Sequence, residues 1–385
     1  MKIIIDTKQL LKCLRFAADI DRRSGTALTA VKLKVTKTKA TLHIANREQS
    51  ILLPLCCTIE QAGQTMLPWT DLLSVLRHTK DKMVSVDTLE AGQIAVLGQT
   101  LFYKVRNAAN PDNNPDVVSF KHKSYVGFTA EDFRKGLNRT LFAADKGAAH
   151  RPGLDTIYFD FSNAGQVGMV ATDGIGFAWQ RLNASYIGNI FDQVAVPAKA
   201  LTLFNKILAD VGGSSLVKMF VEPPKGKFTA VVWLCVNETT MVIRLPEGGL
   251  KYPNWQDIVE VPATSPIMLL DLQGVVLDSL IPAAKSNSDS KGLLNFDKSL
   301  TINAVSGGYQ GVVTVPITSP KKYKDKMTVS LRYLVDALNV LQSASRIECT
   351  VRDSAEKKSC CRYLSVRFDT EDNFTYLIYA KEVTE

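Results

Sequence analysis

The chain has 385 residues, of which 46% are hydrophobic and 22% are charged, so its composition is that of a globular protein with two or three domains. The sequence contains no stretch of eighteen apolar residues, which excludes a membrane-spanning helix. Asp6, Lys8 and Lys12 interrupt the N-terminal apolar residues where a signal peptide would need a continuous run, so we expect a cytoplasmic protein. The net charge of +8 is a mild excess that is compatible with binding to nucleic acid.

The first part of the chain alternates one helix with several strands. A strand at 2–6 leads into a helix over 9–20, in which Leu10, Leu14 and Ala17 repeat at helical spacing. Alternating segments at 31–38, 40–46 and 50–57 indicate strands. A second helix over 67–79 has Pro68 in its first turn, and strands at 83–89, 93–98 and 101–107 follow it. The Pro- and Asn-rich stretch 107–118 is typical of a loop or linker.

The rest of the chain repeats this rhythm, with helices predicted over 128–145, 196–211, 269–285 and 330–344. The six helix starts, near Thr7, Pro68, Thr129, Pro197, Asp271 and Ser330, are spaced by roughly 60 to 75 residues, which indicates internal duplication. The alternative is coincidence, because any large α+β protein alternates helices and strands. Two units make one domain of common size, so we predict three similar α+β domains at 1–125, 126–262 and 263–385.

Basic residues recur on these helices and in the loops beside them. Such side chains can attract DNA phosphates without reading bases. For each helix alone the alternative is an ordinary solvated face. The candidate DNA-binding residues are Lys12, Arg15, Arg22, Arg23, Arg77, Lys80, Lys135, Arg139, Lys146, His150, Arg151, Lys199 and Lys206.

The sequence has no constellation of residues that indicates catalysis. The phosphate-binding, dinucleotide-binding, nucleophile-elbow and zinc-protease motifs are all missing. Asp173 has no neighbouring carboxylates in sequence to complete a metal centre, and the four histidines and seven cysteines show no metal-ligand spacing. We therefore expect a binding protein that is not an enzyme and that has no cofactor and no metal.

Three segments in the middle of the chain resemble consecutive signatures of the bacterial sliding clamp, the β subunit of DNA polymerase III. They are VGMVATDGIGFAWQRL, VAVPAKALTLFNKIL and LPEGGLKYPNWQDIV, in the order and at the spacing of that family. The N-terminal MKIIIDTKQLLKCL and the late SLRYLVDAL resemble the family's first strand and helix and its last helix. The resemblance therefore extends over the whole chain.

The resemblance implies three domains, each a pair of similar halves, and two chains joined head to tail in a closed ring with helices lining the hole and sheets outside. It implies a processivity factor that encircles duplex DNA without sequence preference and tethers the replicative polymerase. Implied partners are double-stranded DNA, a second copy of the chain, the catalytic subunit of the polymerase, the clamp loader and other peptides with a clamp-binding motif.

The resemblance also implies a pocket for partner peptides between the middle and last domains. It is carried over onto Leu154, Thr172, Gly174, Ile175, Gly176, Phe177, Pro253, Ile258 and Ile378. The alternative for each is a core position between domains. Two departures concern this pocket: Ile175-Gly176 replaces the family's His-Arg after Thr-Asp-Gly, and the chain ends in YLIYAKEVTE instead of a Met-Pro-Met-Arg-like tail. We therefore expect the pocket to accept a different peptide.

Ring closure requires one edge strand from each end of the chain. The resemblance implies an edge at 101–107, with Tyr103 and Val105 facing the partner chain, and a second edge near Leu280 and Ile281. Two alternatives stay open: a clamp-like scaffold that binds proteins without being loaded on DNA, and a basic nucleic-acid enzyme such as a nuclease whose site escapes motif reading.

Overall fold

The computed structural model describes residues 1–23, 31–89, 92–106, 116–145, 153–224, 229–246, 252, 254–259, 267–271, 280–281, 290–306, 309–319, 325–341, 344, 346–353, 362–368 and 373–382. By mutual contacts the chain divides into two compact units. Unit 1 comprises Met1–Phe133, Ala184–Phe191 and Lys199–Gly249, and unit 2 comprises Arg134–Asn183, Asp192–Ala198 and Leu250–Glu385. The residue boundaries of the three expected domains stay a prediction.

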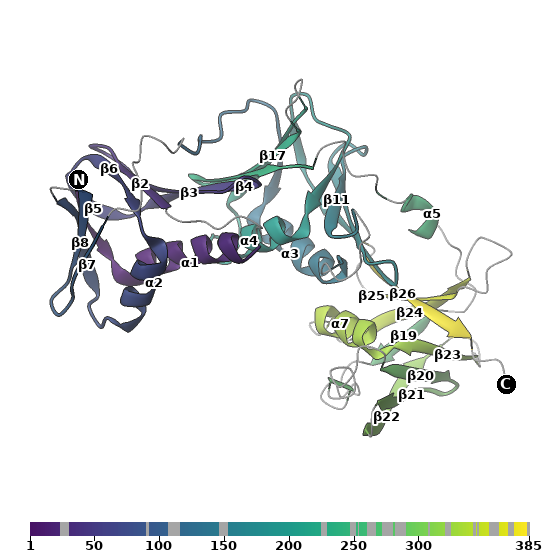
Figure 1. Ribbon diagram of the computed structural model, residues 1–385. Coiled ribbons are helices and arrows are strands. Elements are labelled where there is room, and N and C mark those ends of the chain that lie inside the picture. The colour runs from purple at the N-terminus through teal and green to yellow at the C-terminus, as the bar shows by residue number, and fades with distance from the viewer. Residues whose placement is uncertain are drawn as a thin grey trace. The chain divides into compact units, whose positions relative to one another are not determined.

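In five of six repeats the described elements follow one order, a strand, a helix and further strands, and in the fifth repeat most of the segment between the first two strands lies outside the described residues (Figure 1). The first two repeats are β1 (Lys2–Asp6), α1 (Thr7–Arg23), β2 (Val31–Val35), β3 (Ala40–Ala45), β4 (Gln49–Leu55) and β5 (Cys57–Gln61), and then β6 (Gly63–Leu67), α2 (Trp69–His78), β7 (Met83–Leu89), β8 (Gln93–Leu97) and β9 (Phe102–Arg106).

The next two repeats are β10 (Tyr125–Thr129), α3 (Ala130–Thr140), the short helix η3 (Leu141–Ala143), β11 (Thr156–Asp160), β12 (Gln166–Thr172), β13 (Gly176–Asn183) and β14 (Ser185–Ile187), and then β15 (Gln193–Pro197), α4 (Ala198–Leu208), β16 (Leu216–Glu222), β17 (Val231–Val236) and β18 (Thr239–Arg244). The short α5 (Gln256–Val259) follows.

The last two repeats are β19 (Met268–Asp271), β20 (Lys291–Phe296), β21 (Ser299–Ser306) and β22 (Tyr309–Thr318), and then β23 (Asp325–Ser330), α7 (Leu331–Leu341), β24 (Arg346–Asp353), β25 (Arg362–Phe368) and β26 (Phe374–Glu382). Five helices begin within one residue of the predicted starts, so the predicted α+β repeat is confirmed. The helix predicted over 269–285 is wrong for 269–271, which belong to β19, while 280–281 are helical and the rest lies outside the described residues.

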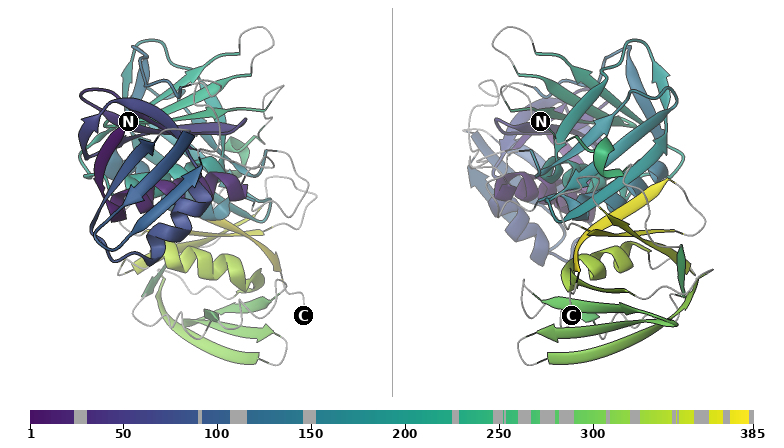
Figure 2. Two further views of the ribbon diagram at one scale, coloured as in Figure 1. Left: turned by 60° about the vertical axis from the view of Figure 1, so that its left-hand side comes forward. Right: turned by 90° about the vertical axis from the view of Figure 1, so that its right-hand side faces the viewer.

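Unit 1 contains two sheets and an apolar core beneath its helices. The strand orders are β5-β1-β7-β8-β9 and β14-β10-β16-β17-β18-β4-β3-β2-β6. The helix α1 buries Leu10, Leu14 and Ala17, the three residues whose spacing predicted it. In Figure 2 (left) α1 and α2 lie together beside the strands of this unit.

Unit 2 contains one sheet of twelve strands in the order β15-β11-β12-β13-β26-β23-β20-β21-β22-β19-β24-β25, with β25 also paired to β26. The helix α7 buries Leu331, Leu334, Leu338 and Leu341. It lies against β25 and the long C-terminal strand β26, drawn in yellow in Figure 2 (right).

Among the described residues of each unit, one antiparallel pairing joins strands from different pairs of repeats. In unit 1 β4 pairs with β18, so that Leu52 lies opposite Thr240. In unit 2 β13 pairs with β26, so that Trp179 lies opposite Thr375. The strands β4 and β13 each belong to the first repeat of a pair. The strands β18 and β26 are each the last strand of the next pair. We call these two pairings the junctions.

A segment without sheet structure, Asp116–Phe120, crosses the junction of unit 1, and we call it the strap. Asp116 accepts hydrogen bonds from Lys32 at 2.7 Å and from Lys34. The N–H of Val117 donates to Nδ1 of His43 at 3.0 Å, and the N–H of Phe120 donates to Oγ1 of Thr240 at 3.2 Å. The strap is therefore held to β2, β3 and β18.

His43 must be neutral to hold the strap, because its Nδ1 accepts a hydrogen bond while its Nε2 lies 2.9 Å from Oγ1 of Thr41. Burial lowers the pKa of His43 to about 4, with Lys34 and Lys32 contributing in the same direction and Asp116 opposing them. Burial alone would raise the pKa of Asp116, but hydrogen bonds from Lys32 and Lys34 hold it at about 2.

Unit 1 should lose stability as the pH falls from 6.5 toward 4, the ordinary and the folded-state pKa of His43. Because the pKa of His43 is lower in the folded state than the ordinary value of 6.5, its contribution is complete above pH 6.5 and declines toward pH 4. His43→Asn keeps an acceptor and does not titrate there. Its melting temperature should fall less than that of the wild type between pH 6.5 and 4.5, by at least about 2 °C. Parallel melting curves for the two proteins would contradict this role of His43.

Candidate functional site

The Thr172-Asp173-Gly174 segment forms the tight turn between β12 and β13. Gly174 has a φ of 90°, a left-handed conformation that glycine adopts without strain. The hydroxyl of Thr172 donates to the carbonyl of Gly176 at 2.7 Å, and Oδ1 of Asp173 accepts from the N–H groups of Ile175 and Gly176 at 3.0 and 2.9 Å. These residue types at this spacing therefore build a turn, as Asx and Thr side chains commonly do.

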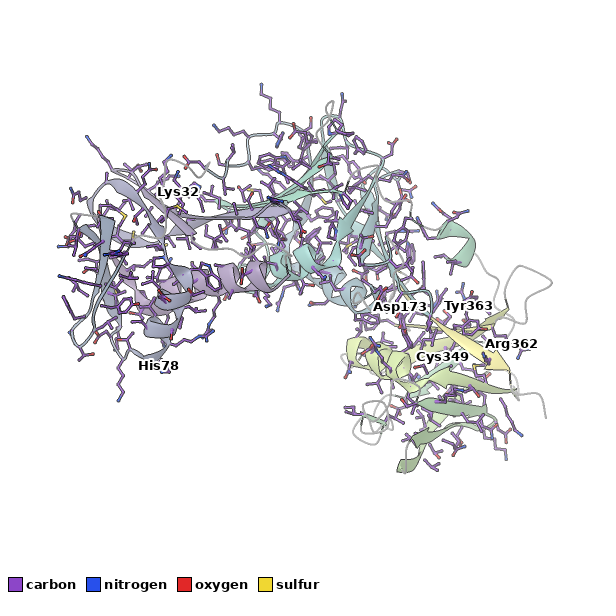
Figure 3. The ribbon with its side chains drawn as sticks, in the orientation of Figure 1. Lys32, His78, Asp173, Cys349, Arg362 and Tyr363 are labelled. Carbon is purple, nitrogen blue, oxygen red and sulfur yellow. The ribbon has the colours of Figure 1, made fainter. Side chains whose placement is uncertain are left out.

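The other oxygen of Asp173 connects this turn to α7, since Oδ2 accepts a hydrogen bond from Oη of Tyr333 at 2.5 Å. Burial raises the pKa of Tyr333, and the carboxylate of Asp173 raises it further, so the phenol stays a neutral donor. The carboxylate of Asp173 thus holds the turn together and connects it to α7. Figure 3 labels Asp173 in this part of unit 2.

Gly176 is required because two tyrosines occupy the space where a side chain would point. A Cβ atom there would lie 2.4 Å from Oη of Tyr376 and 2.8 Å from Cδ1 of Tyr333. Tyr376 is fully buried, and its hydroxyl has no hydrogen-bond partner in the described chain. At the second position of the sequence departure Ile175-Gly176, the two tyrosines therefore leave no room for a side chain.

An aromatic cluster covers one face of β12, β13 and β26. Val170, Phe177, Trp179 and Leu377 are buried there, and six partly buried side chains pack on them: Tyr158, Tyr252, Trp255, Ile258, Val259 and Tyr363. Tyr158 and Tyr252 stack with ring centres 4.9 Å apart, and Nη1 of Arg352 donates to the carbonyl of Val259 at 2.9 Å. Figure 3 labels Tyr363, which belongs to this cluster.

The structure brings together most of the predicted pocket residues but buries several of them. Gly176 lies opposite Ile378, the carbonyl of Ile175 accepts from the N–H of Tyr379 at 2.9 Å, and Ile258 packs on the cluster that contains Phe177. Ile175 is 44% exposed and Ile258 is half-buried. Five of the predicted pocket residues are buried, namely Leu154, Thr172, Gly176, Phe177 and Ile378, and Pro253 lies outside the described residues.

The candidate DNA-binding residues have different surroundings. In unit 1 Lys12 forms an ion pair with Asp210, and Lys206 forms one with Asp19 at 2.7 Å, so α1 and α4 lie side by side in opposite directions. Arg15, Arg77, Lys80 and Lys199 are exposed, and Lys135 is half-buried. Arg22 and Arg23 end α1, and their side chains lie outside the described residues, as do Lys146, His150 and Arg151.

Arg139 is the exception, because it is 6% exposed and lies inside unit 2. Its Nη1 donates to Oε1 of Gln180 at 3.1 Å, and its guanidinium lies 4.1 Å from the ring centre of Phe368 and 5.4 Å from that of Phe374. A cation stacked on two aromatic rings stabilises the interior and is not presented to a polyanion. We therefore leave Arg139 out of the DNA-binding proposal below.

The first expected dimer edge, on β9, stays a prediction, and the second does not lie on a strand. The strand β9 pairs with β8 and, within the described residues, with no other strand, and Tyr103 and Val105 on it are half-buried. The expectation of a strand near Leu280 and Ile281 is wrong, because both residues are helical and Leu280 is fully buried. The helix predicted over 269–285 includes both residues, so the spacing of the residues indicated the helix and only the carry-over from the resemblance misplaced the edge.

Two expected absences stay predictions. Among the residues that the structure describes, no three His, Cys, Asp or Glu side chains gather as metal ligands. In the same part of the chain no helix is long and apolar enough to span a membrane.

Comparison with known proteins shows the fold. No protein-family model matches the sequence, and no curated protein sequence matches it. Among solved structures, the DNA polymerase sliding clamp from Bacillus subtilis superimposes with a TM-score of 0.80 at 17% identity, covering 100% of both chains. The β subunit of DNA polymerase III from Thermotoga maritima gives a TM-score of 0.79 at 13% identity, again covering 100% of both chains.

A third similar structure is the sliding clamp from Pseudomonas aeruginosa bound to griselimycin, with a TM-score of 0.80, 18% identity and 100% coverage of both chains. The fold of this chain is therefore that of the sliding clamps, over its full length. The resemblance read from the sequence is confirmed at the level of the fold.

The packing at Gly176 leads to a test by substitution. Gly176→Ala should lower the free energy of unfolding by about 1–3 kcal/mol, because it forces apart Tyr376 and Tyr333. Adding Tyr376→Phe should recover part of the loss, since it removes the atom nearest to the new methyl group. Gly168→Ala in β12 is the matched control, because a Cβ there would meet its nearest atom at 3.5 Å, an ordinary contact. Equal unfolding midpoints in urea for the two alanine variants would contradict the assignment.

Proposed function

We propose that this chain is a divergent member of the bacterial sliding-clamp family, a non-enzymatic processivity factor that encircles duplex DNA and tethers the replicative polymerase. The observation that carries the proposal is the match of the fold to sliding clamps over the full length of the chain. A closed ring is held on DNA by topology, so its contacts to phosphates can be weak, mobile and independent of sequence. A polymerase tethered to it stays at a high effective concentration near its template.

We infer ring closure from the repeat. The two junctions use equivalent strands, and in the described chain one strand equivalent to each partner takes part in no junction. In the last pair of repeats, β22 is equivalent to β4 and β13. In the first pair, β9 is equivalent to β18 and β26. In the described chain, residues 309–316 of β22 pair with β21 alone, and its last two residues pair with β19. We propose that β22 of one copy pairs with β9 of a second copy.

The junctions also supply the register of this pairing. Gln49 in β4 and Gly176 in β13 each begin a strand after a two-residue turn, and they lie opposite Ile243 and Ile378. Tyr309 is the residue of β22 that corresponds to Gln49 and Gly176, and Val105 is the residue of β9 that corresponds to Ile243 and Ile378. Tyr309 would therefore lie opposite Val105 of the second copy. The same register puts Val312 opposite Phe102 of the second copy.

Exposure supports this register. Phe102 is 68% exposed and Val312 is 64% exposed, the highest values among the large apolar side chains of the described residues. A cross-strand pair of an aromatic and a β-branched side chain stabilises an antiparallel sheet by about 0.2–1 kcal/mol. Tyr103 and Val105, which the resemblance assigned to the interface, would lie opposite Gly311 and Tyr309.

We propose that partner peptides bind at the aromatic cluster of unit 2, where Ile175 and Ile258 offer apolar surface next to Tyr363 and Tyr379. A large side chain buried there would contribute about 1.5–3 kcal/mol. We propose further that Arg15, Arg77, Lys80 and Lys199, which are exposed, contact the DNA backbone, with Lys135, Arg22, Arg23, Lys146, His150 and Arg151 assigned from sequence alone.

A scaffold that binds proteins without being loaded on DNA is the second candidate. It is favoured by the ion pairs of Lys12 and Lys206 with Asp210 and Asp19, which leave less positive charge for DNA, and by the burial of Arg139. A dimer that DNA does not retain would identify this function.

A cysteine pair tests the register between two copies. Phe102→Cys with Val312→Cys should form a disulfide between chains under mild oxidation, giving a species of twice the chain mass on a non-reducing gel. Phe102→Cys with Thr314→Cys is the matched control, because it moves one cysteine two residues along the same face and should cross-link far less. Equal cross-linking of both variants, or cross-linking only of the control, would contradict the register.

The same variant tests encirclement. Oxidised after mixing with nicked circular DNA, the closed ring should stay with the DNA at 1 M NaCl, where backbone contacts are screened, and should leave once the DNA is cut to a linear form. Oxidised before mixing, it should not bind at that salt concentration. Retention on linear DNA equal to that on circles would contradict the clamp function, and wild-type protein at low salt concentration provides the same comparison without a disulfide.

A further inference from the structure

A groove follows each side of the strap in unit 1. The larger groove has a volume of about 640 Å³ and is lined by residues of β2, β3, β4, β17 and β18 together with the strap. The smaller one, on the side of Gln49 and Arg244, has a volume of about 250 Å³. Val117 and Val118 line both, so the strap is the divider between them. In Figure 3 Lys32 marks β2, one of the strands under this region.

The two junctions differ in the size of the side chains that cover one face of the sheet. In unit 2 the segment that holds Tyr252, Trp255 and Ile258 packs large side chains onto the sheet. In unit 1 the strap buries the smaller Val117 and leaves Val118 54% exposed beside the larger groove. The strap itself is held by three strands, so the exposure of Val118 is a fixed feature of the groove wall.

The walls of the larger groove combine apolar surface with positive charge. Leu52, Pro54, Val118 and Phe120 provide the apolar part, and Lys34, Lys39 and Lys121 line it as well. Of the two carboxylates in the lining, Asp116 is held by Lys32 and Lys34, and Glu238 pairs with Lys39 at 2.9 Å.

The pair between Lys39 and Glu238 can exchange partners at little cost. The two side chains are 63% and 60% exposed, and ion pairs at such exposure contribute little to stability. Lys121 is exposed at the same groove. A carboxylate placed between Lys39 and Lys121 would therefore meet two cations, while an apolar neighbour would meet Val118 and Leu52.

We propose that this groove is a second partner site, which binds an extended protein segment in which acidic and large apolar residues alternate. The site lies in unit 1 and its occupancy does not depend on ring closure or on DNA. A peptide fits better than a nucleic acid, because the groove is partly apolar, whereas a nucleic acid backbone is a continuous run of phosphates.

The test uses capped fluorescent hexapeptides of alternating Glu and Leu, with alternating Lys and Leu and alternating Ser and Leu as comparisons. The full-length protein should bind the Glu-Leu peptide at least tenfold more tightly than the other two, by fluorescence polarisation. Lys39→Glu with Lys121→Glu should weaken this binding at least tenfold, and Val118→Asp should weaken it as well. Lys291→Glu with Lys298→Glu, on exposed positions of unit 2, makes the same change in net charge and should leave the binding unchanged.

Four results would overturn the proposal: no binding of the Glu-Leu peptide, equal binding of the Ser-Leu peptide, an equal loss in the control variant, or displacement of the peptide by a short DNA duplex at equimolar concentration. Thermal melting of each variant separates loss of the site from loss of the fold. Because the readout is peptide binding by the protein without DNA, its failure would leave the clamp function standing.

Discussion

The antiparallel pairing of strands from different pairs of repeats is the interaction on which the rest of the structure depends. It joins β4 to β18 in unit 1 and β13 to β26 in unit 2, in the same register relative to the neighbouring hairpin turns. A strand edge satisfies its backbone N–H and C=O groups only when another strand pairs with it, so each junction turns an edge of one repeat into the interior of a sheet. Two junctions within each chain and, in the proposed ring, two more between the chains use every such edge, which is the physical reason to expect a ring rather than an open array.

The candidate sites lie where these junctions form, and they differ because the covering residues differ. At the junction of unit 2, the turn at Asp173, the hydrogen bond from Tyr333 and the close packing of Gly176 fix the end of β13 against β26. The aromatic cluster then covers the sheet. At the junction of unit 1, a thin strap held by His43 leaves open grooves on both sides. One fold thus presents two surfaces of different chemistry at equivalent places.

The sequence predicted the repeat well because each helix carries its own local signals. The apolar spacing of Leu10, Leu14 and Ala17 and the proline before α2 and α4 depend only on neighbouring residues, and five helix starts followed from them. Positions decided by distant partners were not predicted. Arg139 has the spacing of a surface stripe but stacks on Phe368 and Phe374, which lie more than two hundred residues further on. The strand edge at β22 was missed for the same reason, since only the pairing of the other repeats identifies it.

The mass of the purified full-length protein in solution tests the central claim most directly. If β22 of each copy pairs with β9 of the other, light scattering at micromolar concentration and physiological salt should give twice the chain mass of 42.4 kDa, and Phe102→Glu should shift the protein toward the single-chain mass. A wild-type protein that stays at the single-chain mass, or one that grows into an open series of larger species, would contradict the closed pairing.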